Sequence, residues 1–243
     1  MAPALVLLHG FTNTGASWDG VAAAVRERYR PLAPDIRGHG TASAVTPVDL
    51  ASVIDDVAAL IGQVETVTLA GYSMGGRLAL HAAFALVPRV DRLVLIGASP
   101  GLEQPDERAA RVAADEQLAN EIEIETIEAF AARWAQTAVL ADQPERIRAA
   151  VDADRRRNTP RGLAGALRGL GTGALPSLWD RLFELRAPVD LIVGERDQKF
   201  RATAERMAAA LPAARLHVVP GAGHAVHLED PAAVAAIIAG TSR

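Results

Sequence analysis

The stretch Gly71-Tyr72-Ser73-Met74-Gly75 constrains this chain more than any other. It is a G-x-S-x-G pattern, preceded by an apolar run, residues 67–70, and followed by an Ala/Leu-rich helical run, residues 78–86. This context predicts a sharp strand-to-helix turn that raises Ser73 above a sheet, with glycines where side chains would clash. The helix that begins under the serine would present free N–H groups and the positive end of its dipole. We therefore expect Ser73 at the carboxyl edge of a buried sheet.

Strand and helix patterns alternate along most of the chain, which predicts an α/β fold with a parallel sheet covered on both faces. Most strand candidates are continuous Val, Leu and Ile runs, as expected of strands that are buried on both sides. Strands are predicted at Ala4–His9, Arg30–Asp35, Thr66–Ala70, Arg92–Gly97, Val189–Val193 and Arg215–Val219. Helices are predicted at Trp18–Arg28, Pro47–Ile61, Met74–Leu86, Ala202–Leu211 and Pro231–Ala239.

The alternation stops between Gly101 and about Pro188. This stretch has helical patterns rich in Arg, Glu and Ala, is punctuated by prolines, and has no clear strand pattern. A long interruption after the fourth strand predicts a helical cap, inserted at about residues 101–187 of a single domain formed by residues 1–243. A chain of 243 residues, half of them hydrophobic, is long enough for such a domain.

The composition argues against several classes of protein. A net charge of −4 argues against non-specific binding of nucleic acid and against polybasic attachment to a membrane. No apolar run approaches the roughly 18 residues of a membrane span, and we do not expect the short run at residues 5–8 to be a signal peptide. The absence of cysteine removes disulfides, thiolate metal ligands and cysteine nucleophiles, and it fits a cytoplasmic protein.

Two residues further along the chain would complete a catalytic set with Ser73. Asp197 comes just after the predicted strand Val189–Val193, and His224 comes just after the next strand. Because neighbouring parallel strands end at the same edge of a sheet, we expect the acid, the histidine and the serine to meet there. The chain order Ser, Asp, His is that of α/β-hydrolases and differs from chymotrypsin and subtilisin. The histidine would activate the serine, and the aspartate would orient the histidine.

Two backbone N–H groups are predicted to form an oxyanion hole. Phe11 follows the first strand through His9-Gly10, and Met74 directly follows the serine, so both N–H groups can point at one oxygen. His9 itself is interpreted as structural, because it follows directly on a buried strand.

Two other histidines are also interpreted as structural. His39 lies in a tight loop after the second strand. His227 with Glu229 suggests a metal pair, but no third ligand is evident, so we assign His227 to the start of a helix and expect no metal site. We expect no cofactor either.

Arginine is the sequence feature that indicates the substrate. Arg77 lies four residues after Ser73, one helical turn along, and so on the same face of the helix. An unpaired guanidinium at this position is costly unless it binds an anion. The predicted cap adds Arg111 and the run Arg155-Arg156-Arg157, and Lys199 lies beside the predicted catalytic acid. These groups would bind a polycarboxylate if they face one pocket; alternatively, the cap arginines are solvated and pair with the many glutamates.

The chain resembles the α/β-hydrolase superfamily over nearly its whole length, from Leu5 to His224. Within it, the chain is most similar to the menaquinone-pathway synthases that form 2-succinyl-6-hydroxy-2,4-cyclohexadiene-1-carboxylate. The motifs that carry the resemblance are Gly71–Arg77, Pro100-Gly101-Leu102 with Glu107-Arg108 and Arg111, Gly194–Phe200 and Gly223–Pro231.

The chain departs from the usual pattern of these families in two places. The two antiparallel strands that usually precede the first parallel strand are expected to be absent, which leaves about six strands in the order 2-1-3-4-5-6. That order reverses between strands 1 and 3, where a ligand crevice is expected. Ser99 stands where members of the synthase family often have His.

The resemblance implies a lyase that needs no cofactor. Such an enzyme removes pyruvate by a 2,5-elimination from a substrate with several carboxylates. Its serine, histidine and aspartate would abstract a proton rather than transfer an acyl group. The developing enolate-like oxygen would lie in the predicted oxyanion hole.

The resemblance also implies which residues bind the substrate. Arg77, Arg111 and Arg155 would hold its carboxylates. Tyr72 and Trp134 match residues that border the substrate, with packing aromatics as the alternative. The assignment of Arg155 competes with that of the two arginines that follow it.

Two other functions fit parts of the sequence. One is a carboxylesterase or C–C bond hydrolase that acts on an anionic substrate through an acyl-Ser73 intermediate. The other is a non-catalytic receptor or scaffold, against which the complete triad argues. Arg77 and the motif Gly194–Phe200 favour the lyase over the hydrolase.

Overall fold

The computed structural model describes residues 2–63, 66–137, 140 and 143–241. One sheet of six strands has the order β2-β1-β3-β4-β5-β6, and each neighbouring pair of strands is parallel. The strands are β1 (Ala4–Leu8), β2 (Arg30–Leu32), β3 (Val67–Tyr72), β4 (Val90–Ile96), β5 (Val189–Gly194) and β6 (Ala214–Val219). The fold class and the strand order predicted from the sequence are therefore confirmed.

The edge strand β2 is shorter than the predicted Arg30–Asp35. It pairs only with β1 and ends at Leu32. Pro34 has no N–H to donate to a strand ladder. The carboxylate of Asp35 accepts a hydrogen bond from the N–H of Gly15 (2.8 Å), so this segment binds a neighbouring loop instead of extending the sheet.

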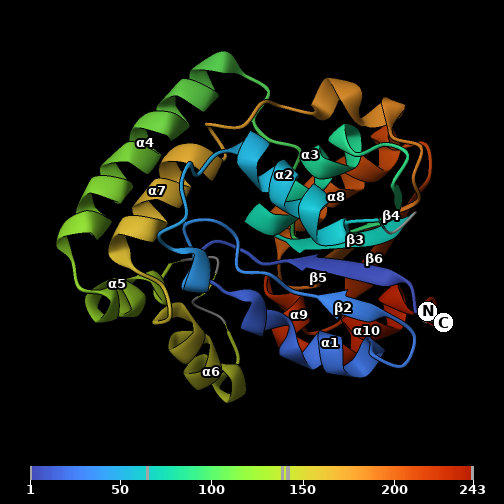
Figure 1. Ribbon diagram of the computed structural model, residues 1–243, viewed down its shortest axis with the longest axis horizontal. Coiled ribbons are helices and arrows are strands. Elements are labelled where there is room, and N and C mark those ends of the chain that lie inside the picture. The colour runs from blue at the N-terminus through green and yellow to red at the C-terminus, as the bar shows by residue number, and fades with distance from the viewer. Residues whose placement is uncertain (1, 64–65, 138–139, 141–142, 242–243) are drawn as a thin grey trace.

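Helices cover both faces of the sheet (Figure 1). One layer consists of α2 (Leu50–Ile61), α3 (Met74–Ala85) and α8 (Gln198–Ala210). The other consists of α1 (Asp19–Val25), α9 (Val226–Glu229) and α10 (Pro231–Ile238). Short 3-10 helices occur at η1 (Gly15–Trp18), η2 (Gly40–Ala42) and η3 (Trp179–Glu184).

Aspartates that cap helices explain two differences from the predicted boundaries. Helix α8 begins at Gln198 rather than Ala202, because Asp197 caps it by accepting a hydrogen bond from a backbone N–H of the first turn. Asp49 caps α2 in the same way, so that helix begins at Leu50. The cap of α8 is functionally relevant because Asp197 is also the predicted catalytic acid.

Among the described residues, four α-helices lie between β4 and β5 in the chain and are called the cap helices below. They are α4 (Pro105–Ile124), α5 (Ile127–Trp134), α6 (Glu145–Arg155) and α7 (Pro160–Leu170). Helices α4, α5 and α7 share a small apolar core with Ile122, Phe130 and Leu163 at its centre. In Figure 1 the cap helices lie to one side of the sheet and its two helix layers. The predicted range of the cap, about residues 101–187, also includes residues 138–139 and 141–142, which lie outside the described residues.

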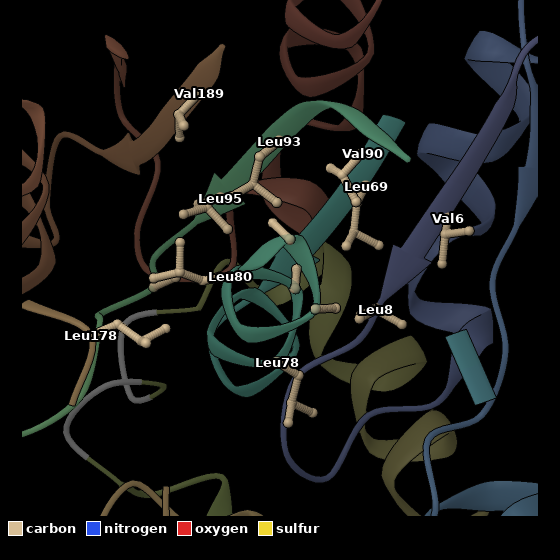
Figure 2. Packing of buried hydrophobic residues seen from close by; sticks show 14 of the residues in the cluster. Val6, Leu8, Leu69, Leu78, Leu80, Val90, Leu93, Leu95, Leu178 and Val189 are labelled. Atoms are coloured by element: carbon tan, nitrogen blue, oxygen red, sulfur yellow. The ribbon is translucent and has the colours of Figure 1, made fainter. Parts of the chain in front are cut away.

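The core between the sheet and α3 fixes the helix that follows Ser73. Figure 2 shows Leu80 of α3 near Leu95 of β4, within a cluster that also holds Leu69 of β3 and Leu8 of β1. These side chains are all nearly or fully buried. In the part of the chain that the structure describes, no helix is both long enough and apolar enough to cross a membrane.

We predict that Leu80→Ala lowers the free energy of unfolding by about 2–5 kcal/mol, because it leaves a cavity between α3 and the sheet. Urea unfolding monitored by circular dichroism measures this change. Ile124→Ala is the matched control, since Ile124 is 88% exposed and its truncation is expected to change stability by no more than about 0.5 kcal/mol. Equal effects of the two substitutions would contradict the assigned core.

Candidate active site

Ser73 lies in a strained turn that only its glycine neighbours permit. Its φ and ψ angles are 51° and −110°, a conformation that residues other than glycine rarely adopt. A Cβ at Gly71 would overlap the carbonyl oxygen of Gly75, and a Cβ at Gly75 would overlap that of Leu8. Neither overlap can be relieved without moving backbone, so the G-x-S-x-G spacing is a packing requirement of this turn.

The predicted triad is assembled by three loops at the carboxyl edge of the sheet. The Nε2 atom of His224 lies 3.2 Å from the Oγ of Ser73, and its Nδ1 lies 2.6 Å from Oδ2 of Asp197. The other oxygen of Asp197 accepts the capping hydrogen bond from Phe200 N–H (3.2 Å). The start of α8 therefore fixes the carboxylate that orients the imidazole. This geometry suits removal of the serine proton by the histidine.

Sequence reasoning missed the residues that hold the His224 loop in place. The buried carboxylate of Glu229 accepts hydrogen bonds from Gly223 N–H (2.9 Å) and from the guanidinium of Arg196 (2.8 Å). The ring of Phe200 packs against the imidazole with 4.4 Å between ring centroids. Arg196 and Phe200 belong to the motif that carries the family resemblance, but their contacts with the loop need the fold to be seen.

Phe11 and Met74 line the same cavity as Ser73. Among the described residues, neither N–H donates a hydrogen bond to the protein, so both can donate to a substrate oxygen. Thr12, directly after Phe11, has a φ of 70°, which bends the loop after β1. The predicted oxyanion hole is compatible with this arrangement, and its role stays a prediction.

A cavity of about 250 Å³ separates the sheet edge from the cap helices. It is lined by the serine and histidine of the triad, both oxyanion-hole residues and every residue predicted to bind substrate. These six binding candidates are Tyr72, Arg77, Arg111, Trp134, Arg155 and Lys199. Several polar lining residues were not predicted from the sequence, among them Thr12, Asn13, Gln143 and Thr172. They lie in loops or in the cap, where no motif marks them.

Arg77 is a buried cation that forms no salt bridge with any described residue. Its side chain lines the cavity, the residue is 9% exposed, and its Nε has no hydrogen-bond partner in the described part of the structure. Burial and the positive charge of Arg111 lower the pKa of the Arg77 guanidinium to about 10, and the carboxylate of Asp115 only partly opposes this, so Arg77 remains charged at neutral pH. A desolvated charge of this kind is stable only when something else compensates it, and the cavity offers room for an anion.

The other two candidate arginines reach the cavity from cap helices. Arg111 of α4 is held by Asp115, with Nε 2.8 Å from Oδ1. Arg155 of α6 is 2% exposed and donates to Thr12 Oγ1 at 3.4 Å. Burial lowers the pKa of the Arg155 guanidinium.

The structure separates Arg155 from the two arginines that follow it. Arg156 is exposed and pairs with Asp152 (2.7 Å), and Arg157 is exposed as well. Neither of them is among the residues that line the cavity. Of the three arginines in this run, Arg155 is therefore the one that faces the site.

Aromatic rings and one lysine complete the wall. Tyr72 is buried, which raises the pKa of its phenol, and its ring lies 5.2 Å from that of His224. Trp134 packs edge-on against Phe11 at 5.3 Å. Lys199 is exposed at the start of α8 and lies at the edge of the cavity. All of these residues can border a bound substrate, and their roles stay predictions.

The three histidines interpreted as structural, His9, His39 and His227, are buried. His9 accepts a hydrogen bond from Ile36 N–H (2.9 Å) and thereby ties β1 to the loop after β2. Burial lowers the pKa of His39 to about 3 and that of His227 to about 3. His227 lies in α9 between the rings of Trp18 and Tyr72, at 4.7 and 4.2 Å. Among the described residues, no three His, Cys, Asp or Glu side chains gather as a metal site.

Comparison with known proteins agrees with this architecture. The model of the alpha/beta hydrolase family matches residues 5–237. The chain belongs to the alpha/beta hydrolase family. The 2-succinyl-6-hydroxy-2,4-cyclohexadiene-1-carboxylate synthase of Salmonella agona (strain SL483) is 35% identical over 235 residues, which cover 96% of this chain and 91% of that protein.

Two further relatives support the same placement within the family. A relative from Bacillus subtilis (strain 168) is 40% identical over 236 residues, which cover 94% of this chain and 86% of the Bacillus protein. The solved structure of MenH from S. aureus has a TM-score of 0.93 and 29% identity, and the match covers 98% of this chain and 92% of that one. The resemblance to the synthase family is thereby confirmed.

We predict that His227→Phe makes stability less sensitive to acid. Below about pH 6.5 the unfolded chain binds a proton at His227, whereas the folded chain does so only near pH 3. The unfolded state thus holds more protons, and the free energy of unfolding falls as the pH falls, by up to about 1.4 kcal/mol per pH unit for this group.

Urea unfolding at pH 7.5, 6.0, 5.0 and 4.5 tests this prediction. Phenylalanine keeps the ring between Trp18 and Tyr72 but cannot be protonated, so the variant should lose less stability than the wild type between pH 6 and pH 4.5. If the free energy of unfolding depended on pH in the same way for the two proteins, His227 would not be buried in its neutral form.

Proposed function

We propose that this protein is a 2-succinyl-6-hydroxy-2,4-cyclohexadiene-1-carboxylate synthase that acts in menaquinone biosynthesis. Its substrate would be 2-succinyl-5-enolpyruvyl-6-hydroxy-3-cyclohexene-1-carboxylate, from which it would eliminate pyruvate. One observation carries the proposal: the buried guanidinium of Arg77, unpaired among the described residues, shares a cavity with the Ser73–His224 pair. The names of the relatives at 35% identity or above support the same reaction. We also propose a cytoplasmic location, as expected from the cysteine-free sequence.

The charges around the cavity suit a substrate with several carboxylates. The charge of Arg111 contributes to the lowered pKa of Arg77, and both side chains line the cavity, so one carboxylate can bind between them. Arg155 approaches from α6, and Lys199 stands at the edge of the cavity. A neutral ester would leave Arg77 without an ion-pair partner, whereas a bound carboxylate would pair with it. The predicted binding partner is accordingly a polycarboxylate, with no nucleic acid and no membrane involved.

The triad would supply the base for the elimination. His224, oriented by Asp197, takes the proton of Ser73, and the serine oxygen removes the proton from ring carbon 2 of the substrate. The electrons of that C–H bond form a double bond between carbons 2 and 3. The ring double bond moves to carbons 4 and 5, and the C5–O bond breaks to release the enolate of pyruvate, which is then protonated.

Carbon 2 is acidic because it lies beside the succinyl carbonyl. As its proton leaves, negative charge develops on that carbonyl oxygen. The N–H groups of Phe11 and Met74, which have no protein acceptor among the described residues, are available to stabilise the charge. The arginines would hold the carboxylates so that carbon 2 faces Ser73.

We predict that the purified protein releases pyruvate from this substrate without added metal or nucleotide. Lactate dehydrogenase and NADH, added only after the enzyme has been removed from the reaction, measure the pyruvate that was released. Ser73→Ala is the control and should abolish most of it, because alanine cannot take the proton. Absence of pyruvate release, together with fast turnover of simple esters, would instead indicate a hydrolase that acts through an acyl-Ser73 intermediate.

We predict that Arg77→Ala costs about 2–4 kcal/mol of transition-state stabilisation, seen as a lower kcat/KM, while the fold remains intact. The matched control is Arg156→Ala, because Arg156 is exposed, pairs with Asp152 and does not line the cavity. Steady-state kinetics of pyruvate release and circular dichroism of both variants provide the measurement. A wild-type kcat/KM for Arg77→Ala would refute its role.

A further inference from the structure

A group of buried polar contacts joins the cap to the loop that follows β1. The carboxylate of Asp154 in α6 accepts hydrogen bonds from Thr14 N–H (2.9 Å), from the hydroxyl of Thr14, and from Asn13 Nδ2 (3.4 Å). Asp154 is 8% exposed and lies 140 residues from Thr14 in the chain. Its ion-pair partner among the described residues, Arg157, approaches only to 4.0 Å and is exposed. Neutral donors of the loop therefore provide most of the stabilisation of this carboxylate.

Asn158, which lies just after the end of α6, adds further hydrogen bonds between the cap and the loop that follows β1. Its Nδ2 donates to the carbonyl oxygens of Thr12 (2.8 Å) and Arg155 (2.9 Å). Its Oδ1 accepts a hydrogen bond from Gly40 N–H (3.0 Å) in the loop after β2. We call Asp154, Asn158 and their hydrogen bonds to residues 12–14 the polar latch.

Two parts of the candidate site lie on opposite sides of the polar latch. On the cap side is Arg155, whose guanidinium donates to Thr12 Oγ1 and to the carbonyl oxygen of Ala131, each at 3.4 Å. On the other side is Phe11, whose N–H is a predicted oxyanion donor. These two residues are far apart along the chain, but each is adjacent to a residue of the latch.

The contacts of Arg155 itself are too weak to fix its position. Both of its hydrogen bonds are long, no carboxylate forms a salt bridge with it among the described residues, and it is 2% exposed. The stronger, shorter contacts are those of its neighbour Asp154 and of Asn158. The backbone on either side of Arg155 is therefore held firmly, and the position of the guanidinium follows from it.

We propose that Asp154 and Asn158 are positioning residues, which fix Arg155 and the Phe11 loop relative to each other and so set the distance between a bound carboxylate and the oxyanion hole. The role in catalysis rests on the proposed function. The geometric part does not, because it concerns only how the protein holds its own side chains. Hydrogen-bonded neighbours of a substrate-binding group typically affect activity through such positioning.

A double-mutant cycle on kcat/KM for pyruvate release tests the proposal. Asp154→Asn should lower kcat/KM by about tenfold in the wild-type background and have little further effect when Arg155 is already replaced by lysine, because residues that act as a unit are not additive. Glu145→Gln is the matched control: it removes the same charge from the same helix, but Glu145 is exposed and its partner is the exposed Arg148. It should leave kcat/KM unchanged.

A second variant covers the case in which Asp154→Asn folds poorly. Thr14→Val removes the hydroxyl that donates to Asp154 and that also accepts a hydrogen bond from Ala16 N–H (3.3 Å), and it should show the same dependence on Arg155. Thr14→Ser keeps both hydrogen bonds and should therefore retain wild-type activity. The proposal would be overturned if a latch substitution lowered kcat/KM by the same factor in the wild-type background and in the Arg155→Lys background. Such strict additivity is what a merely structural role predicts.

Crystal structures of the wild type and of Asp154→Asn separate this proposal from the proposed function. We expect the guanidinium of Arg155 to leave Thr12 Oγ1 in the variant. An unchanged Arg155 would overturn the positioning role even if the wild type releases pyruvate. If the wild type releases no pyruvate but Arg155 moves, the proposed function fails while the positioning of Arg155 by the latch stands.

Discussion

The candidate site depends on a buried positive charge that forms no salt bridge with any described side chain. Arg77 extends from the same helix that begins under Ser73, and its Nε has no partner among the described residues. Burying a guanidinium in this way opposes folding, so the surrounding core must provide the compensating stability. Part of that stability comes from the core cluster of Figure 2, in which leucines of α3 lie beside leucines of β3 and β4. A bound carboxylate would remove the electrostatic penalty, which would make binding selective for anions.

The strained turn at Ser73 and the cap helices have separate roles: the turn presents the reactive serine, and the cap helices contribute arginines that line the cavity. The turn, made possible by Gly71 and Gly75, presents the serine to His224 at the edge of the sheet. This part of the site is shared with hydrolases and does not by itself decide the chemistry. The cap helices bring Arg111 and Arg155 over that edge and enclose the cavity. The reaction that we propose thus depends on the cap, whereas the reactive group depends on the sheet.

Much of this arrangement could be predicted from the sequence because it follows from local patterns. All six strands were predicted, most of them from continuous apolar runs, and the order Ser, Asp, His placed the triad at one edge. Helix boundaries were less accurate, since the capping role of Asp197 adds a first turn to α8 that no apolar periodicity reveals. Outside the triad, contacts between distant segments could not be predicted. The hydrogen bonds of Arg196 to Glu229 and of Thr14 to Asp154 join residues that are 33 and 140 positions apart, and local sequence patterns carry no information on such pairs.

The central claim is that Ser73 removes a proton from carbon rather than attacking a carbonyl group. Single-turnover release of pyruvate from substrate that carries deuterium at ring carbon 2 tests it most directly. We expect slower release than from unlabelled substrate, with no covalent adduct on Ser73 in the mass spectrum of quenched enzyme, because the C–H bond breaks in the step that frees pyruvate. Equal rates for the two substrates, together with an acyl adduct on Ser73, would contradict the claim.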